Sequence, residues 1–215
     1  MRVKICGLTR AEDARAAQDL GAWALGFIFY PKSKRFIDAG TAKSIIAGLP
    51  PTAQPIGVFV NQTDEAICIA KDAGLKGIQL HGDETPDDLR RVRAAFSGTI
   101  IKALRPKTGA DLQAIADYKG LADFILLDAA VRNEYGGTGH TGDWSLAQKA
   151  AGLGIPVIVA GGLGPDNIAA AYAQTNPHAL DLSSGVEASP GIKDHEKLQA
   201  LFASIKGSTH AAQNA

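Results

Sequence analysis

The chain has 215 residues, and its 22 basic side chains balance its 22 acidic ones. This balance argues against nucleic acid or an anionic membrane as the main partner, because both attract a strongly basic surface. With 46% hydrophobic and 20% charged residues the composition is typical of a globular protein, and two cysteines are too few for a disulfide framework or a four-thiolate zinc site.

Eight short apolar runs recur at intervals of about 25 residues. Most of them are continuous rather than alternating, which is typical of parallel strands that are buried on both faces. The predicted strands are 3–6, 24–29, 56–60, 77–80, 99–104, 124–127, 156–160 and 179–182.

Helix signals lie between these strands. Thr9 followed by Glu12 predicts a capping box, and Thr85 before a proline predicts an N-cap. Further starts are predicted at Thr108 with Asp111 and at Gly164-Pro165, and helix ends at Gly21, Gly74 and 152–154.

Eight strand–helix units predict a single (β/α)8 barrel, a TIM barrel, over residues 1–207. A polar tail that is expected to fray follows at 208–215. An open doubly wound sheet is the alternative that the same pattern allows. In a barrel, the active site lies at the carboxyl ends of the strands, so the residues just after each run are the informative ones.

Glycine-rich segments follow the last two strands, where barrels often bind phosphate. Glycine lets the backbone approach an anion, and backbone N–H groups then donate hydrogen bonds to it. Tight turns would also explain either segment alone. Because both segments occupy the expected positions, we interpret them as a phosphate site. Its residues are Gly161, Gly162, Ser183, Ser184 and Gly185.

Two strand ends carry groups suited to proton transfer. Cys6 is either a small buried hydrophobe or, if it faces the barrel mouth, a base whose thiolate takes a proton. Asp128 either caps a turn or acts as a general acid beside the phosphate site.

Two further strand ends carry groups that could bind a substrate. Arg35 lies in a basic run that is either a solvated loop or a source of one carboxylate-binding arginine. His81 is either structural or a donor to the substrate. The segment 137–142 matches G-x-G-x-x-G, but it does not follow a strand directly. A loop that closes over a substrate is favoured there over a dinucleotide site.

Taken together, these segments resemble the phosphoribosylanthranilate isomerase family of tryptophan biosynthesis. The resemblance extends from residue 3 to residue 194. The matching segments are 4–9 (KICGLT), 26–29 (GFIF), 31–35 (PKSKR), 57–61 (GVFVN), 79–84 (QLHGDE), 127–129 (LDA), 136–139 (GGTG), 160–163 (AGGL), 181–187 (DLSSGVE), 189–191 (SPG) and 193–194 (KD).

The resemblance implies a (β/α)8 barrel that converts N-(5-phosphoribosyl)anthranilate to 1-(2-carboxyphenylamino)-1-deoxyribulose 5-phosphate. This Amadori rearrangement uses no cofactor and no metal. The resemblance also implies that Asp128 is the general acid, that Cys6 is the general base and that Arg35 faces the anthranilate carboxylate. The phosphate would lie on Gly162 and 183–185. Further residues implied to face the substrate are His81 and Asp181.

One position departs from the family pattern, and one residue has no assigned role. The family usually has Phe-Asp-Trp after its glycine loop, whereas this chain has glycine at position 142, which affects loop packing rather than a catalytic atom. Lys4 lies on the same strand face as Cys6. Because the first and last strands of a barrel are neighbours, we predict that Lys4 pairs with Asp181 within about 6 Å.

Three other functions are known for barrels that bind phosphate in this way or are allowed by the same pattern. Related aminoaldose isomerases of histidine biosynthesis carry aspartate in place of Cys6, and the lysine and glutamate machinery of indole-glycerol-phosphate synthase is not found. A non-catalytic barrel that binds a phosphorylated ligand is the third. The expected partner is a phosphorylated small molecule, with no nucleic acid and no membrane. We expect a monomer, with a homodimer as the alternative. Free thiols and a start without a signal peptide predict a cytoplasmic protein.

Overall fold

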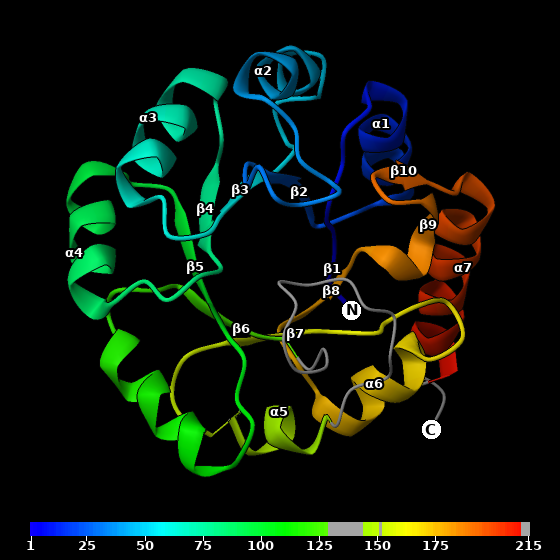
Figure 1. Cartoon of the computed structure of the whole chain (residues 1–215). Coiled ribbons are helices and arrows are strands. Elements are labelled where there is room, and N and C mark those ends of the chain that lie inside the picture. Colours follow the sequence, from blue (N-terminus) through cyan, green and yellow to red (C-terminus); the bar gives the residue numbers. More distant parts are fainter. Residues whose placement is uncertain (129–143, 151, 212–215) are drawn as a thin grey trace.

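The computed structural model describes residues 1–128, 144–150 and 152–211. Eight parallel strands form a closed barrel in chain order, and β1 is hydrogen-bonded to β8. Figure 1 looks along this barrel and shows the helices as a ring around it. The predicted (β/α)8 barrel is confirmed. The open doubly wound sheet is excluded, because such a sheet leaves two edge strands unpaired.

Each strand lies within one residue of its predicted bounds. The strands are β1 (Val3–Ile5), β2 (Ala24–Ile28), β3 (Pro55–Phe59), β4 (Gly77–Leu80), β5 (Thr99–Leu104), β6 (Phe124–Asp128), β7 (Val157–Ala160) and β8 (Ala179–Leu182). Their side chains are almost all buried, since one face packs on the helices and the other fills the barrel. Ile158 and Ala160, for example, belong to the cluster inside the barrel, whereas Val157 and Val159 belong to the outer core.

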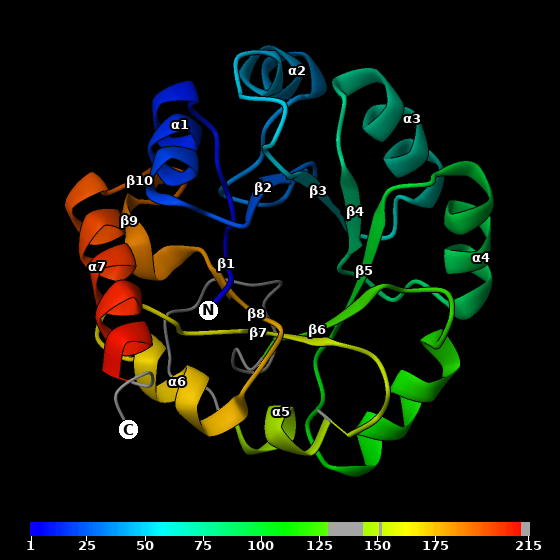
Figure 2. The same cartoon turned by 180° about the vertical axis from the view of Figure 1, so that it is seen from behind.

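Helices cover the outside of the barrel. They are α1 (Ala11–Leu20), α2 (Ala39–Ala47), α3 (Thr63–Ala73), α4 (Pro86–Ala95), the 3₁₀ helix η1 (Ala110–Tyr118), α5 (Ser145–Ala150), α6 (Ile168–Thr175), the 3₁₀ turn η2 (Ser184–Val186) and α7 (His195–Ala211). Helix α7 packs between α6 and α1 and so completes the ring, which Figure 2 shows from behind. Because α7 continues to Ala211, the first residues of the predicted tail are helical, and 212–215 lie outside the described residues.

Some predicted helix ends are confirmed. Thr85 forms a full capping box at the start of α4, and Gly21 and Gly74 end α1 and α3 in the left-handed conformation. The segment that follows Thr108 forms the 3₁₀ helix η1. Just before this helix, the Thr108 backbone N–H donates a hydrogen bond to the Asp111 carboxylate at 2.8 Å.

Two predicted helix starts are wrong. Helix α1 is preceded by Arg10 without a side-chain cap, because the Thr9 hydroxyl donates instead to the distant carbonyl of Gly191 at 2.5 Å. Helix α6 begins after Gly164-Pro165. Asn167 holds that segment as a turn, with its side chain bound to the N–H of Gly164 and the carbonyl of Gly162.

A short hairpin that the sequence analysis did not predict follows β8. Its strands are β9 (Glu187–Ser189) and β10 (Ile192–Lys193), and Lys193 lies opposite Glu187. The backbone N–H of Lys193 donates to the buried carboxylate of Asp13 at 2.9 Å, which anchors the hairpin to α1. Among the described residues, no helix combines the length and the apolar character needed to cross a bilayer.

Candidate active site

One pocket opens at the carboxyl ends of the strands, where the barrel predicts it. It encloses about 760 Å³ of space between atoms, including the part open to solvent. The predicted residues that line it are Cys6, Arg35, His81, Asp128, Gly161, Gly162, Asp181, Ser183 and Ser184. These residues follow or end strands β1, β2, β4, β6, β7 and β8, which are spread around the barrel, so closure of the sheet brings them together.

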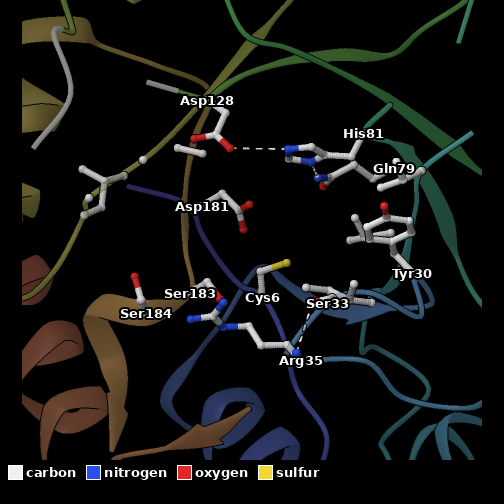
Figure 3. Close-up of a pocket in the computed structure, with 17 residues that line it drawn as sticks. Cys6, Tyr30, Ser33, Arg35, Gln79, His81, Asp128, Asp181, Ser183 and Ser184 are labelled. Carbon is white, nitrogen blue, oxygen red and sulfur yellow. Dashed lines mark hydrogen bonds and ion pairs between the residues drawn. The ribbon is translucent and has the colours of Figure 1, made fainter. Parts of the chain in front are cut away.

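Cys6 follows β1 directly and is a buried free thiol. Figure 3 shows its side chain among the labelled polar groups of the pocket. Burial raises the pKa of Cys6, although the neighbouring ammonium groups of Lys4 and Lys193 act in the opposite direction. The thiol form therefore predominates at neutral pH, and a thiolate can form with two cations close by.

Asp128 ends β6 on the far side of the pocket from β1. Its Oδ2 lies 3.4 Å from Nε2 of His81. The other ring nitrogen of His81, Nδ1, lies 2.7 Å from the amide nitrogen of Gln79, and Figure 3 shows this row of side chains. Because the Gln79 amide N–H donates to Nδ1, the neutral ring carries its hydrogen on Nε2, toward Asp128.

The predicted pairing of Lys4 with Asp181 is confirmed. Strand register places the two residues side by side on β1 and β8, and Lys4 Nζ lies 2.9 Å from Asp181 Oδ1. Burial alone would lower the pKa of Lys4, but the interactions with Asp181 and Cys6 together outweigh it and raise this pKa. Burial raises the pKa of Asp181 more than Lys4 lowers it, and the nearby charge of Asp128 adds to the rise.

Arg35 enters the pocket from the loop after β2. Its side chain passes over Gly7, where a Cβ atom would come within 2.6 Å of Arg35 Cδ and 3.0 Å of Ser183 Oγ. The guanidinium binds the carboxylate of Glu187 through Nε at 2.8 Å and Nη2 at 2.7 Å. Arg35 is therefore held in place rather than solvated, and it lies beside the loop that follows β8.

The loops after β7 and β8 present backbone and a hydroxyl group to the pocket. Gly161 and Gly162 have φ angles of +102° and +64°, which favour glycine and leave no side chain over the backbone. The Ser183 hydroxyl is buried and has no hydrogen-bond partner among the described residues. Gly185 is not among the lining residues. It packs against the carbonyl of Leu163, leaving no room for a Cβ atom, so it joins the two loops.

Sequence reasoning missed several polar groups of the site. Tyr30, Ser33 and Gln79 line the pocket, and Glu187 lies behind Arg35. Strand periodicity could have revealed Gln79, since it lies two residues before His81 on the same face of β4. The segment 137–142 and the departure at position 142 lie outside the described residues.

Comparison with known proteins adds to this geometry. A family model described as N-(5'phosphoribosyl)anthranilate (PRA) isomerase matches residues 3–204. The chain belongs to the phosphoribosylanthranilate isomerase family. Membership makes it an isomerase, as the resemblance implied, and assigns it to tryptophan biosynthesis.

Individual relatives of this isomerase family agree over nearly the full length. An N-(5'-phosphoribosyl)anthranilate isomerase of Pseudomonas fluorescens (strain SBW25) is 46% identical over 98% of both chains. The crystal structure of the Thermotoga maritima phosphoribosyl anthranilate isomerase is similar at a TM-score of 0.88 and 39% identity, covering 96% of this chain and 99% of that one.

A third relative contains a bound ligand. A phosphoribosyl anthranilate isomerase was crystallised in complex with reduced 1-(o-carboxyphenylamino)-1-deoxyribulose 5-phosphate. It is similar to this chain at a TM-score of 0.84 and 37% identity, over 96% of this chain and 99% of that one. That ligand carries a phosphate and a carboxylate, so it supports a phosphorylated small molecule as the ligand of this family member.

Proposed function

We propose that this isomerase converts N-(5-phosphoribosyl)anthranilate to 1-(2-carboxyphenylamino)-1-deoxyribulose 5-phosphate. The observation that carries the proposal is the arrangement of side chains in the pocket of this chain, which belongs to the isomerase family. A carboxyl group and a thiol, Asp128 and Cys6, enter it from different strands, with the carboxyl group of Asp181 between them in the view of Figure 3.

The first step is ring opening with Asp128 as the general acid. Its carboxyl group gives a proton to the furanose ring oxygen, the bond from this oxygen to C1 breaks, and the anilino nitrogen forms a protonated Schiff base with C1. His81 supports this step, because its Nε2–H faces the Asp128 carboxylate that is left behind. Gln79 keeps that hydrogen on Nε2.

The second step is proton removal from C2 with Cys6 as the general base. The adjacent protonated Schiff base makes this C–H acidic. As Cys6 takes the proton, the C–H electron pair forms a C1–C2 double bond, and the C1–N double-bond pair returns to nitrogen to give the enolamine. The enolamine then becomes the ketone when C1 gains a proton and the C2 hydroxyl loses one. The acid and the base must begin in opposite protonation states. Burial keeps most of Cys6 in the thiol form, and the ammonium groups of Lys4 and Lys193 stabilise the thiolate that this step requires.

Binding of the two ends of the substrate completes the proposal. The phosphate group lies on the backbone of Gly161 and Gly162 and beside Ser183 and Ser184. The Ser183 hydroxyl supports this, because it has no partner in the part of the chain that the structure describes, and a buried donor without a partner is costly unless a ligand binds it. Arg35 binds the anthranilate carboxylate through the edge of its guanidinium that Glu187 does not contact.

The activity test follows the fluorescence of phosphoribosylanthranilate, generated in place from anthranilate, after addition of purified protein with chelator and without cofactor. Enzyme-dependent loss of fluorescence is expected. If the folded protein binds the reduced product analogue without turnover, the chain is a binding barrel and the proposal is wrong.

The acid and base roles are tested by Asp128→Asn and Cys6→Ala. Each substitution should lower kcat by roughly 10²–10⁴-fold, as is usual for groups that transfer protons, while the product analogue still binds. The matched control is Cys68→Ala, because Cys68 is exposed on α3 and does not line the pocket. Near-normal turnover in Cys6→Ala or Asp128→Asn would exclude that residue from its role.

The carboxylate contact is tested by Arg35→Ala. This substitution should mainly raise KM, because it removes binding that is similar in the ground and transition states. An unchanged KM would argue against the contact.

We also propose that the protein is a cytoplasmic monomer. The Thermotoga maritima relative is described as dimeric, so light scattering after size-exclusion chromatography decides between the two states.

A further inference from the structure

A buried cluster of three charges lies behind the pocket wall, and the proposed reaction gives no role to the carboxylate at its centre. It consists of Arg35, Glu187 and Lys193, which we call the Glu187 cluster. Glu187 Oε1 accepts from Arg35 Nε at 2.8 Å and from Lys193 Nζ at 2.8 Å, while its Oε2 accepts from Arg35 Nη2 at 2.7 Å. Neither Glu187 nor Lys193 is more than 7% exposed.

The cluster joins segments that are far apart in the sequence. Arg35 comes from the loop after β2, and the other two residues are cross-strand partners in the β9–β10 hairpin. Lys193 Nζ also donates to the backbone carbonyl of Ser183 at 3.1 Å. The Glu187 carboxylate therefore contacts the arginine directly. Through Lys193 it is also linked to the loop in which the phosphate site is proposed.

The hydrogen bonds of Arg35 leave one of its nitrogens available. Glu187 takes the Nε–H and an N–H of Nη2, and among the described residues no acceptor binds Nη1. A guanidinium held on one edge by a carboxylate presents its other edge in a fixed direction. Figure 3 shows the Arg35 guanidinium beside Ser183 at the pocket wall.

The charge of the cluster also suits a single carboxylate. Burial alone would raise the pKa of Glu187, but Arg35 and Lys193 outweigh this effect and hold it below its usual range. Glu187 is therefore ionised at neutral pH, and two cations with one anion leave one net positive charge. This net charge attracts a ligand with a single negative charge. Because Glu187 neutralises one of the two cations, the free protein avoids the cost of burying both without a counter-charge.

We propose that Glu187 is a positioning residue that orients Arg35 toward the carboxylate of the aromatic ring and so sets the preference for a carboxylated substrate. This inference rests on the proposed function, in which Arg35 binds that carboxylate.

The experiment compares two ligands by isothermal titration calorimetry. One is reduced 1-(o-carboxyphenylamino)-1-deoxyribulose 5-phosphate, and the other is the same compound without the ring carboxylate. The measured quantity is the ratio of their dissociation constants. Glu187→Gln adds net positive charge, which strengthens binding of both anions, but it frees Arg35 to turn. We expect the preference for the carboxylated ligand to fall at least tenfold, while the ligand without the carboxylate still binds.

Three variants accompany Glu187→Gln. Arg35→Ala should abolish the preference, and adding Glu187→Gln to it should change the ratio no further. Glu196→Gln is the matched control, because Glu196 is exposed at the start of α7, and it should leave the ratio unchanged. Glu187→Asp keeps the buried charge but shortens the side chain, so it tests the orientation should Glu187→Gln not fold.

The outcomes separate the two hypotheses. The role of Glu187 is overturned if Arg35→Ala loses the preference but Glu187→Gln keeps a ratio within a factor of two of the wild-type ratio. If only Glu187→Asp folds, the same criterion applies to that variant. An unchanged ratio in Arg35→Ala would instead show that the proposed carboxylate contact fails, and the role of Glu187 with it. If the wild-type protein binds neither ligand, the proposed function itself is wrong.

Discussion

Replacing Lys4 with methionine should destabilise the protein by an amount that depends on pH. The substitution keeps most of the side-chain volume but removes the ammonium group that lies 2.9 Å from Asp181. With an effective dielectric constant of about 20, Coulomb's law gives roughly 6 kcal/mol of attraction at this distance. The cost of burying the two charges offsets part of it, so breaking the pair should cost about 3–5 kcal/mol.

The pH dependence follows from Asp181. Its pKa is raised by burial in the folded protein, so the folded state binds more protons than the unfolded chain and stability falls as pH rises toward that pKa. Without Lys4 this pKa rises further, and the fall continues to higher pH. Keeping the Asp181 carboxyl protonated costs about 1.4 kcal/mol for each pH unit above its ordinary pKa near 4, which is roughly 5–6 kcal/mol at pH 8 and roughly 1–2 kcal/mol at pH 5.

The assay is urea unfolding followed by circular dichroism at pH 5 and pH 8. Lys4→Met should lose much more free energy of unfolding at pH 8 than at pH 5. Adding Asp181→Asn should recover part of the loss, since neither position of the former pair then carries a charge. Lys71→Met is the control, because Lys71 is exposed on α3, and it should have little effect at either pH. A loss under about 1 kcal/mol at pH 8, or an equal loss at both pH values, would refute this account.

Three further predictions concern other buried or capped groups. Because burial raises the pKa of Cys6, its alkylation by iodoacetamide in a Cys68→Ala background should be slow at pH 7 and should increase through pH 9; a plateau below pH 8 would contradict this. The buried ammonium of Lys102 lies 2.6 Å from the Glu84 carboxylate. Glu84→Gln removes this counter-charge and should lower the free energy of unfolding in urea by about 3–5 kcal/mol, whereas an unchanged urea midpoint would show that the pair adds little stability. Thr85→Ala removes the capping box of α4 and should cost about 1 kcal/mol by the same assay, with no change in KM.

The strands and the side chains at their ends could be predicted because both depend on local information. A continuous apolar run is buried on both faces of a parallel sheet, and barrel geometry assigns the residue after each run to one mouth. Cys6, His81 and Asp128 were found in this way, and all three line the pocket. The pairing of Lys4 with Asp181 followed from the same topology, because a closed barrel makes its first and last strands neighbours.

Other features depend on contacts that no local pattern contains. The Thr9 hydroxyl leaves its expected capping position because the carbonyl of Gly191, far along the chain, is within reach. Glu187 and Lys193 become partners only when the hairpin after β8 forms, and they meet Arg35 only when the barrel closes. The sequence by itself therefore determined the architecture and the groups around the mouth of the barrel. The tertiary structure decided how those groups are paired, because buried charges take whichever partners the closed fold brings within hydrogen-bond distance.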